Sequence, residues 1–397
     1  ESEEHARIAN DLLFGIENSF KAFHGQEKAL VDPALIAAKR TADNDLKAKV
    51  AANPALAAEV GDPWADIAKA QADYRALYLS NAMMETRAGI GSDLYRFART
   101  LVRAAAEKTK PNGDRLPAYT DSRLALLSKT LLDPQPVYPE LEQVVLEYWL
   151  SKLRENLTAD APGTKTFLGK DSPETLSKRL AQSKLGDPAV RKALWDGGMA
   201  AIQASDDPMI KFVLATDAAS RAIRKQYEER VSGPTDRAAQ KIARARFAIY
   251  GTNVYPDATF TLRLSYGKVQ GWTDNGITVP SFTYYKGLWE RATGQFPFDL
   301  APRWQTAQTK VNPNTVMNFV STNDIIGGHS GSPIITAKGE VVGAAFDGNI
   351  ESLGGAFGFD ERVNRTVSVS TAAITEALKN VYGDQTLAAE LEGRSRR

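Results

Sequence analysis

The chain has 397 residues and a formal net charge of +1, from 49 Lys and Arg against 48 Asp and Glu. This length exceeds what one hydrophobic core usually organises and indicates two domains. The balanced charge argues against nucleic acid as a partner. The sequence contains no cysteine, which excludes disulfides, thiolate metal sites and a cysteine nucleophile. No stretch approaches the roughly 18 apolar residues that predict a membrane span.

Histidine is scarce, since only His5, His24 and His329 are present, and they are too scattered for an ordinary zinc site. We therefore expect neither a metal nor an organic cofactor. The chain begins with Glu1, and its first residues do not have the pattern of a signal peptide. We expect it to be a processed product or a portion of a longer polypeptide.

Residues 1–246 carry the pattern of an antiparallel helical array. A capping Asp or Ser stands before a proline, which suits a first helical turn, at Asp62-Pro63, Ser172-Pro173, Asp187-Pro188 and Asp207-Pro208. Helical spacing predicts one buried face from Leu94, Phe97, Leu101 and Val102. It predicts a second buried face from Leu141, Val144, Val145, Tyr148 and Trp149.

The pattern changes in residues 247–397, where short apolar segments are separated by glycines. Alternation with polar residues predicts a half-buried strand from Phe260, Leu262, Leu264 and Tyr266. Further strands are predicted at 316–320, at 334–335 and 341–346 as a hairpin, and at 366–369, before a helix over 371–381. The fold class is therefore α+β multidomain. A helical cap domain (1–246) precedes an antiparallel β-barrel or sandwich domain (247–397) with a short C-terminal helix.

The segment with the clearest chemistry is Gly327-Gly328-His329-Ser330-Gly331-Ser332-Pro333. A serine nucleophile needs a base, an exposed position and donors for the oxyanion that it creates. Glycines around Ser330 let the backbone turn tightly, so that the amides of Gly328 and Ser330 can point into one pocket. The alternative is a tight β-turn built from small residues, without catalysis.

The extended segment Thr322-Asn323-Asp324-Ile325-Ile326-Gly327-Gly328-His329-Ser330-Gly331-Ser332-Pro333 resembles the nucleophile segment of the bacterial dipeptidyl-peptidase 7 and 11 family. The likeness continues through Gly339-Glu340-Val341-Val342-Gly343 and Ala345-Phe346-Asp347-Gly348-Asn349, and back to residues 250–267. It is strongest from about residue 248 to 360, and Asn18-Ser19-Phe20-Lys21 is similar to a family segment in the helical region.

The resemblance implies a serine exopeptidase that releases dipeptides from the free N-terminus of peptides. It implies a chymotrypsin-like double barrel with a helical insertion, of which this chain holds the cap and one half barrel. It also implies an exported, periplasmic homodimer. Its partners would be a peptide substrate and the missing N-terminal half of the same protein, which carries the triad histidine and aspartate in this family.

A base for Ser330 is not evident within the chain. His5 and His24 fall on predicted helices, far in sequence from the serine. His329 is a departure from the asparagine usual in the family, and as a neighbour of the serine it points away from it. We interpret His329 as a turn residue that bonds the local backbone. Lys338 lies at the tip of a predicted turn, which places it poorly for a Ser–Lys dyad.

Four further residues are candidates for substrate binding or structure. Asp324 is expected to hold local structure through hydrogen bonds rather than to select basic side chains. By resemblance, Asp347 and Asn18 bind the free ammonium of the substrate, although Asp347 can instead cap the turn at Gly348. In the family, glycine at the position of Gly348 goes with an apolar or aromatic second residue, whereas arginine goes with an acidic one. Alternatively, Gly348 only permits a tight turn.

Two other functions remain open from the sequence. The chain can be a non-catalytic peptide-binding module, or a truncated and inactive protease half, in which cap and half barrel only hold extended peptides. It can also be a helical scaffold whose barrel serves assembly alone. Active-site labelling separates the first of these from an enzyme, and peptide binding separates both from the scaffold.

Overall fold

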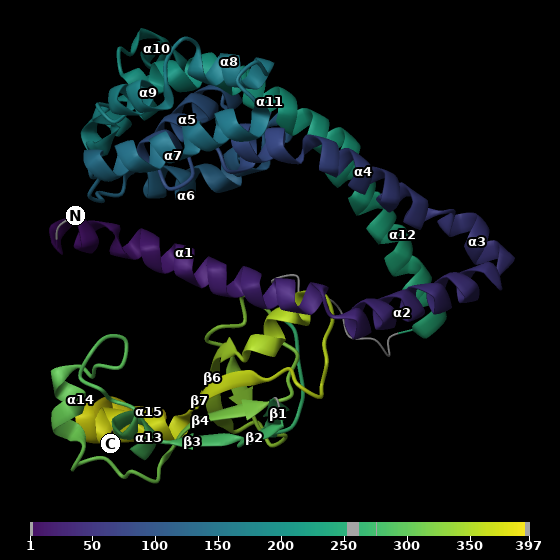
Figure 1. Ribbon diagram of the computed structural model, residues 1–397, viewed down its shortest axis with the longest axis vertical. Coiled ribbons are helices and arrows are strands. Elements are labelled where there is room, and N and C mark those ends of the chain that lie inside the picture. The colour runs from purple at the N-terminus through teal and green to yellow at the C-terminus, as the bar shows by residue number, and fades with distance from the viewer. Residues whose placement is uncertain (1–2, 252–261, 275, 394–397) are drawn as a thin grey trace. The chain divides into compact units, whose positions relative to one another are not determined.

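The computed structural model describes residues 3–251, 262–274 and 276–393 (Figure 1). The chain forms two compact units. The first consists of Glu1–Gly15 and Val50–Ile249, and the second of Ile16–Lys49 and Tyr250–Arg397. The boundary between Ile249 and Tyr250 lies close to the predicted domain boundary after residue 246. The grouping of residues 16–49 with the strands was not predicted, and the two domains as first drawn stay a prediction.

The first unit is helical. Its α-helices are the start of α1 (Glu3–Leu30), then α3 (Pro54–Val60), α4 (Pro63–Asn81), α5 (Asp93–Glu107), α6 (Asp121–Leu132), α7 (Pro139–Leu157), α8 (Pro162–Leu168), α9 (Pro173–Leu180), α10 (Pro188–Ala204), α11 (Pro208–Tyr227) and α12 (Gly233–Tyr250). Short π or 3₁₀ turns join them at η1 (Ala82–Thr86), η2 (Asn112–Asp114), η3 (Pro117–Tyr119), η4 (Lys184–Gly186) and η5 (Glu228–Ser232). Figure 1 shows α5, α7 and α11 bundled together.

All four predicted cap–proline starts are confirmed. The side chains of Asp62, Ser172, Asp187 and Asp207 each accept a backbone N–H of the first turn of α4, α9, α10 and α11. Proline suits the position after the cap because the N–H that it lacks would have no intrahelical acceptor there. These local rules fix helix starts without help from tertiary packing.

The core of the first unit confirms one predicted helix face and part of the other. On α5, Leu94, Phe97, Leu101 and Val102 are buried. On α7, Trp149 is buried as predicted and packs against aromatic rings of α5, α8 and α11. Val144 and Tyr148, however, are 64% and 59% exposed. The other buried apolar residues of that helix are Leu146, Leu150 and Leu153, so the buried face is rotated about the helix axis relative to the predicted one.

Several buried charges in this unit form a network of ion pairs. The Arg103 guanidinium donates two bonds to Glu85, at 2.8 and 2.7 Å, and one to Asp217 at 2.6 Å. Burial alone would raise the pKa of Glu85, but the bond from Arg103 and three nearby guanidinium groups outweigh it, so the pKa is lowered. Burial likewise opposes three hydrogen bonds at Glu107, and the bonds lower its pKa to about 2.

The second unit contains the strands. They are β1 (Trp272–Asp274), β2 (Ile277–Val279), β3 (Phe282–Tyr284), β4 (Val316–Ser321), β5 (Pro333–Ile335), β6 (Val341–Gly348) and β7 (Thr366–Ser370). Its other helical elements are α2 (Pro33–Ala51), α13 (Lys286–Glu290), α14 (Pro302–Ala307), η6 (Ile350–Ala356), α15 (Thr371–Ala377), η7 (Leu378–Tyr382) and α16 (Gln385–Leu391). The last helices pack with α13 and α14 around Tyr285 and Ala373.

Five strands form one antiparallel sheet in the order β3-β4-β7-β6-β5, and β1 and β2 form a separate ribbon. The predicted strand at 316–320, the hairpin and the strand at 366–369 are therefore confirmed. The strand predicted over 260–266 is wrong for residues 262–266, which pair with no strand in the described part of the chain, while Phe260 lies outside the described residues. Closure of the sheet into a barrel stays a prediction.

Candidate active site

The loop that carries Ser330, residues 322–332, connects β4 to β5 and is called the serine loop here. Backbone hydrogen bonds anchor its second half to β6. The amide of Gly331 donates to the carbonyl of Ala345 at 2.7 Å, and the amide of Ala345 donates to the carbonyl of Ser332 at 2.9 Å. Gly328 and Gly331 have φ of 103° and 86°, which side chains rarely tolerate. The glycines therefore allow a turn that leaves Ser330 exposed at its tip.

The amides of Gly328 and Ser330 are free to bind a ligand. Neither donates a hydrogen bond to any acceptor among the residues that the structure describes. Two N–H groups that are not engaged by the described residues, separated by one residue and next to an exposed serine, meet one requirement for stabilising a tetrahedral oxyanion. The arrangement can support acyl transfer once a base is supplied.

His329 bonds the turn, as the sequence predicts. Its Nδ1 lies 2.9 Å from the carbonyl oxygen of Ile326 and 3.2 Å from the amide nitrogen of the same residue. A ring held on the local backbone is unavailable as a base for Ser330. His24 is exposed on α1 and stacks on Phe20 with ring centroids 6.5 Å apart. Among the described side chains, no histidine is hydrogen-bonded to Ser330.

Asp324 has the structural role that the sequence predicts. Its carboxylate pairs with Arg263 at 3.1 Å, and its backbone carbonyl accepts a second bond from the same guanidinium at 3.3 Å. Both side chains are largely buried. Because the charge of Asp324 is already matched, it offers little to a basic substrate side chain, and it ties residue 263 to the start of the serine loop.

Asp347 lies on β6 immediately after a change of register. The pairing of β6 with β7 shifts between Ala345 and Asp347, which marks a β-bulge at Phe346. Bulges redirect the side chains that follow them. Asp347 Oδ1 accepts the amide of Gly348 at 2.8 Å, so the capping role is present. Its other oxygen, Oδ2, lies 3.4 Å from the Nζ of Lys21. One carboxylate thus caps the turn and still presents an oxygen to a cation.

Helix α1 reaches this strand end because two glycines let it approach closely. A Cβ on Gly25 would lie 2.5 Å from Leu353, and a Cβ on Gly354 would lie 2.5 Å from Ala29. Asn18 is exposed one helical turn before Lys21, and residues three apart are neighbours on a helix surface. The structure therefore brings the face that carries Asn18 to the strand end that carries Asp347.

Glycine is needed at position 348 because a neighbouring side chain leaves no room for a Cβ, and not because of its backbone conformation. A Cβ there would lie 2.0 Å from the hydroxyl oxygen of Ser352, which itself donates to the carbonyl of Asn349 at 2.7 Å. Ser352 therefore occupies the space that a side chain at this position would take. Asn349 is buried and bonds the amides of Ser352 and Arg365, which fixes the turn after β6.

Sequence reasoning missed several residues that build this site. Lys21 was noticed only within a resembling segment, and Ser352 and Asn349 were not singled out. Arg365 was also missed. It is 1% exposed and donates to the carbonyls of Gln270, Gly271, Glu361 and Asn364. The sequence signal for Arg365 was its position directly before a predicted strand. This signal was insufficient, because the carbonyl groups that it binds come together only in the folded chain.

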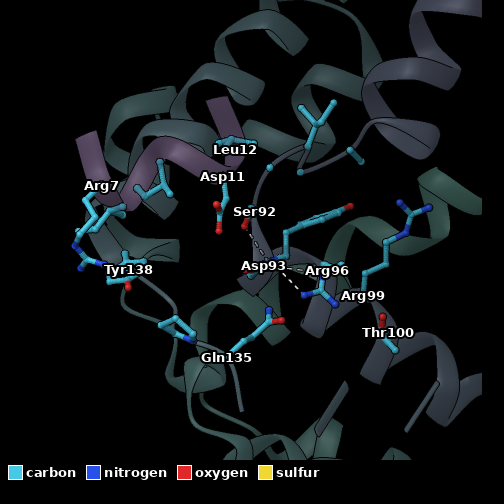
Figure 2. Close-up of a pocket in the computed structure, with 18 of the residues that line it drawn as sticks. Arg7, Asp11, Leu12, Ser92, Asp93, Arg96, Arg99, Thr100, Gln135 and Tyr138 are labelled. Carbon is cyan, nitrogen blue, oxygen red and sulfur yellow. Dashed lines mark hydrogen bonds and ion pairs between the residues drawn. The ribbon is translucent and has the colours of Figure 1, made fainter. Parts of the chain in front are cut away.

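The first unit has a cavity of its own, of about 910 Å³, between the start of α1 and α5. Figure 2 shows Arg7 and Asp11 on one side and Ser92, Asp93 and Arg96 on the other. Arg96 is paired with Asp93 at 2.6 Å. Ser92 is bonded to Glu142, whose pKa burial raises against three hydrogen bonds. Ser92, Asp93 and Arg96 are thus matched within this unit, whereas the exposed Ser330 lies in the other unit.

No three His, Cys, Asp or Glu side chains among the described residues gather closely enough to hold a metal ion. None of the helices in the described ranges combines the length and apolar composition needed to cross a bilayer.

Comparison with known proteins gives consistent matches. The model of the peptidase S46 family matches residues 1–393. Dipeptidyl-peptidase 7 of Phocaeicola vulgatus is 36% identical over 146 residues, which are 34% of this chain and 20% of that protein. The Asp/Glu-specific dipeptidyl-peptidase of Shewanella putrefaciens is 26% identical over 358 residues, which are 79% of this chain and 47% of that protein.

A solved structure extends the likeness to the fold. Porphyromonas endodontalis DPP11 in complex with the dipeptide Arg-Asp matches with a TM-score of 0.72 at 18% sequence identity, over 94% of this chain and 55% of that chain. The chain spans about half the length of the relatives that match most of it.

Proposed function

Because the chain belongs to the peptidase S46 family, we propose that Ser330 is the nucleophile of a serine dipeptidyl-peptidase. The observation that carries this proposal is the exposed Ser330 beside the amides of Gly328 and Ser330, which donate to no acceptor in the described part of the chain, on a turn that Gly331 anchors to β6. The relatives named as dipeptidyl-peptidases support the reaction class.

In this mechanism the Ser330 hydroxyl attacks the carbonyl carbon of the second substrate residue while a base takes its proton. The oxyanion that forms accepts bonds from the amides of Gly328 and Ser330. The base returns the proton to the leaving amine, and the dipeptide remains as an ester on Ser330. Water then attacks the ester, which releases the dipeptide and restores the hydroxyl. We place the base and its orienting acid outside residues 1–397, so this chain alone is inactive.

To release dipeptides, the enzyme must bind the free amino terminus of the substrate at a fixed distance from Ser330. We assign this role to Asp347 and Asn18. Asp347 is oriented by its bond from the Gly348 amide, and its Oδ2 already contacts one ammonium group, that of Lys21. A carboxylate oxygen that accepts one ammonium group is also a strong partner for another. The side-chain oxygen of Asn18, on the same helix face as Lys21, adds a neutral acceptor.

The preference for the second substrate residue is assigned to Gly348 together with Ser352. Neither side chain carries charge, so nothing that they contribute offsets the cost of desolvating an acidic substrate side chain. Apolar side chains gain about 25 cal/mol per Å² of buried area at such a surface. We propose cleavage after an apolar or aromatic second residue and poor cleavage after Asp or Glu.

The architecture, location and oligomeric state of the whole protein are proposed from its membership of the peptidase S46 family. The five-stranded sheet is half of a chymotrypsin-like double barrel, and the helical unit is its cap. The whole protein is a periplasmic homodimer that acts on peptides.

The test of the nucleophile uses the complete gene product that contains these residues. Ser330→Ala should lower kcat by about 10³-fold or more while peptide binding stays close to unchanged, because the hydroxyl acts in chemistry. Ser332→Ala is the matched control in the same loop and should keep most of the activity. A fluorophosphonate probe should label the wild type and not Ser330→Ala. Labelling that survives in Ser330→Ala would show that another residue is the nucleophile.

The test of specificity must respect the contact with Ser352. Gly348→Arg alone should displace η6 and destabilise the unit, since even a Cβ would lie 2.0 Å from the Ser352 hydroxyl oxygen. Gly348→Arg combined with Ser352→Gly relieves that contact and should shift kcat/KM toward Glu and away from Leu at the second residue. Ser352→Gly alone is the control. A wild-type preference for Glu over Leu and Phe in matched substrates would overturn the assignment.

A further inference from the structure

Lys21 occupies the oxygen of Asp347 that the proposed function assigns to the substrate. Its Nζ lies 3.4 Å from Oδ2, and the two side chains are 54% and 48% exposed. A lysine ammonium is the same chemical group as the protonated amino terminus of a peptide, with three donors and one positive charge. An ion pair this exposed is weak in water and easily exchanged.

The position of Lys21 is nevertheless built into the fold. Helix α1 is seated on η6 one turn further on, where Gly25 meets Leu353. Lys28 makes a second ion pair to η6, with its Nζ 3.7 Å from Glu351. The close approach at Gly25 holds the backbone of α1, and the exposed Lys28 pair adds little to it. The ammonium of Lys21 therefore stays within reach of Asp347 whether or not its own pair is formed.

The two ammonium groups compete for one oxygen. Asp347 Oδ1 already accepts the Gly348 amide, which leaves Oδ2 to a cation. We propose that Lys21 is a specificity-determining residue: it neutralises Asp347 in the free protein, and only a ligand with its own cationic amino terminus displaces it. This inference rests on the proposed function of Asp347.

Two consequences follow for binding. A peptide with a free amino terminus must open the Lys21 pair, so Lys21 weakens its binding. A peptide with a blocked terminus carries no replacement charge and leaves the pair closed, and the carboxylate then offers it no oxygen.

The experiment is Lys21→Gln in the complete gene product, with Lys28→Gln as the matched control on the same helix. Lys21→Gln should lower KM for dipeptide substrates with a free amino terminus by about two- to five-fold, the range of an exposed ion pair, and leave kcat unchanged. Lys28→Gln should leave both parameters unchanged. In an Asp347→Asn background, Lys21→Gln should have no further effect on KM, since the two residues act through one contact.

A KM that rises or stays constant in Lys21→Gln, or an equal fall in Lys28→Gln, overturns the inference and indicates a purely structural lysine. These outcomes leave the proposed function intact as long as the wild type releases dipeptides and Ser330 is labelled by a fluorophosphonate. A wild type that does neither overturns the proposed function itself, and the inference with it.

Discussion

The two units differ in whether the polar groups discussed above have partners within the protein. In the helical unit, buried charges such as those of Glu85, Arg103 and Asp217 are matched by ion pairs. In the strand-bearing unit, the amides of Gly328 and Ser330 have no acceptor within the described residues. Groups that are matched hold a fold, whereas groups that are unmatched and exposed are available to a ligand. The comparison places a network of paired buried charges in the first unit and exposed, unengaged amides in the second.

The largest expected effect on stability is that of Arg103→Met, which tests whether the paired buried charges stabilise the helical unit. The change removes the guanidinium between Glu85 and Asp217 and keeps apolar bulk, so two buried carboxylates lose a shared partner. The free energy of unfolding should fall by about 3–5 kcal/mol, measured by urea unfolding followed by circular dichroism. Lys178→Met is the control, because its pair with Glu174 is largely exposed and should contribute less than about 1 kcal/mol. Equal losses in both variants would contradict the distinction.

The next effect is on chemistry and tests the serine loop. Gly328→Ala places a side chain at a φ of 103° and should turn the Gly328 amide away from the oxyanion, which lowers kcat by about 10²–10³-fold. Gly327→Ala is the control in the same turn, since a Cβ there meets nothing within 4 Å. Gly327→Ala should keep the thermal midpoint of the wild type, whereas backbone strain in Gly328→Ala should lower it slightly. A kcat unchanged in Gly328→Ala would show that this amide does not face the reaction.

The contrast also explains what the sequence could predict. Helix caps, the hairpin and the serine turn depend on neighbours in the chain, and these predictions hold at Asp62, at 334–346 and at His329. The inward face of α7 was predicted only in part: Trp149 is buried, but Val144 and Tyr148 are exposed. Two overlapping sets of apolar residues keep helical spacing there, and only packing against other helices selects one.

The candidate site was predictable only in part for the same reason. Asp347 and Asn18 were found by resemblance, but the contact of Lys21 with Asp347 joins residues 326 positions apart. The space at Gly348 is filled by Ser352, and no local pattern indicates this. Both features depend on where η6 meets β6 and α1, and that placement is set by close backbone approach.

The smallest effect tests that approach. Gly25→Ala should force α1 away from η6, because the new Cβ would lie 2.5 Å from Leu353 Cδ1 and 2.8 Å from its Cβ. Overpacking of this kind costs about 1–3 kcal/mol and should lower the thermal midpoint by a few degrees. Gly15→Ala on the same helix meets nothing within 4 Å and should instead stabilise the helix by up to about 1 kcal/mol. If both variants stabilise the protein, α1 is not seated on η6 as described. The strand-bearing unit would then lack the contact that brings Asn18 and Lys21 to Asp347.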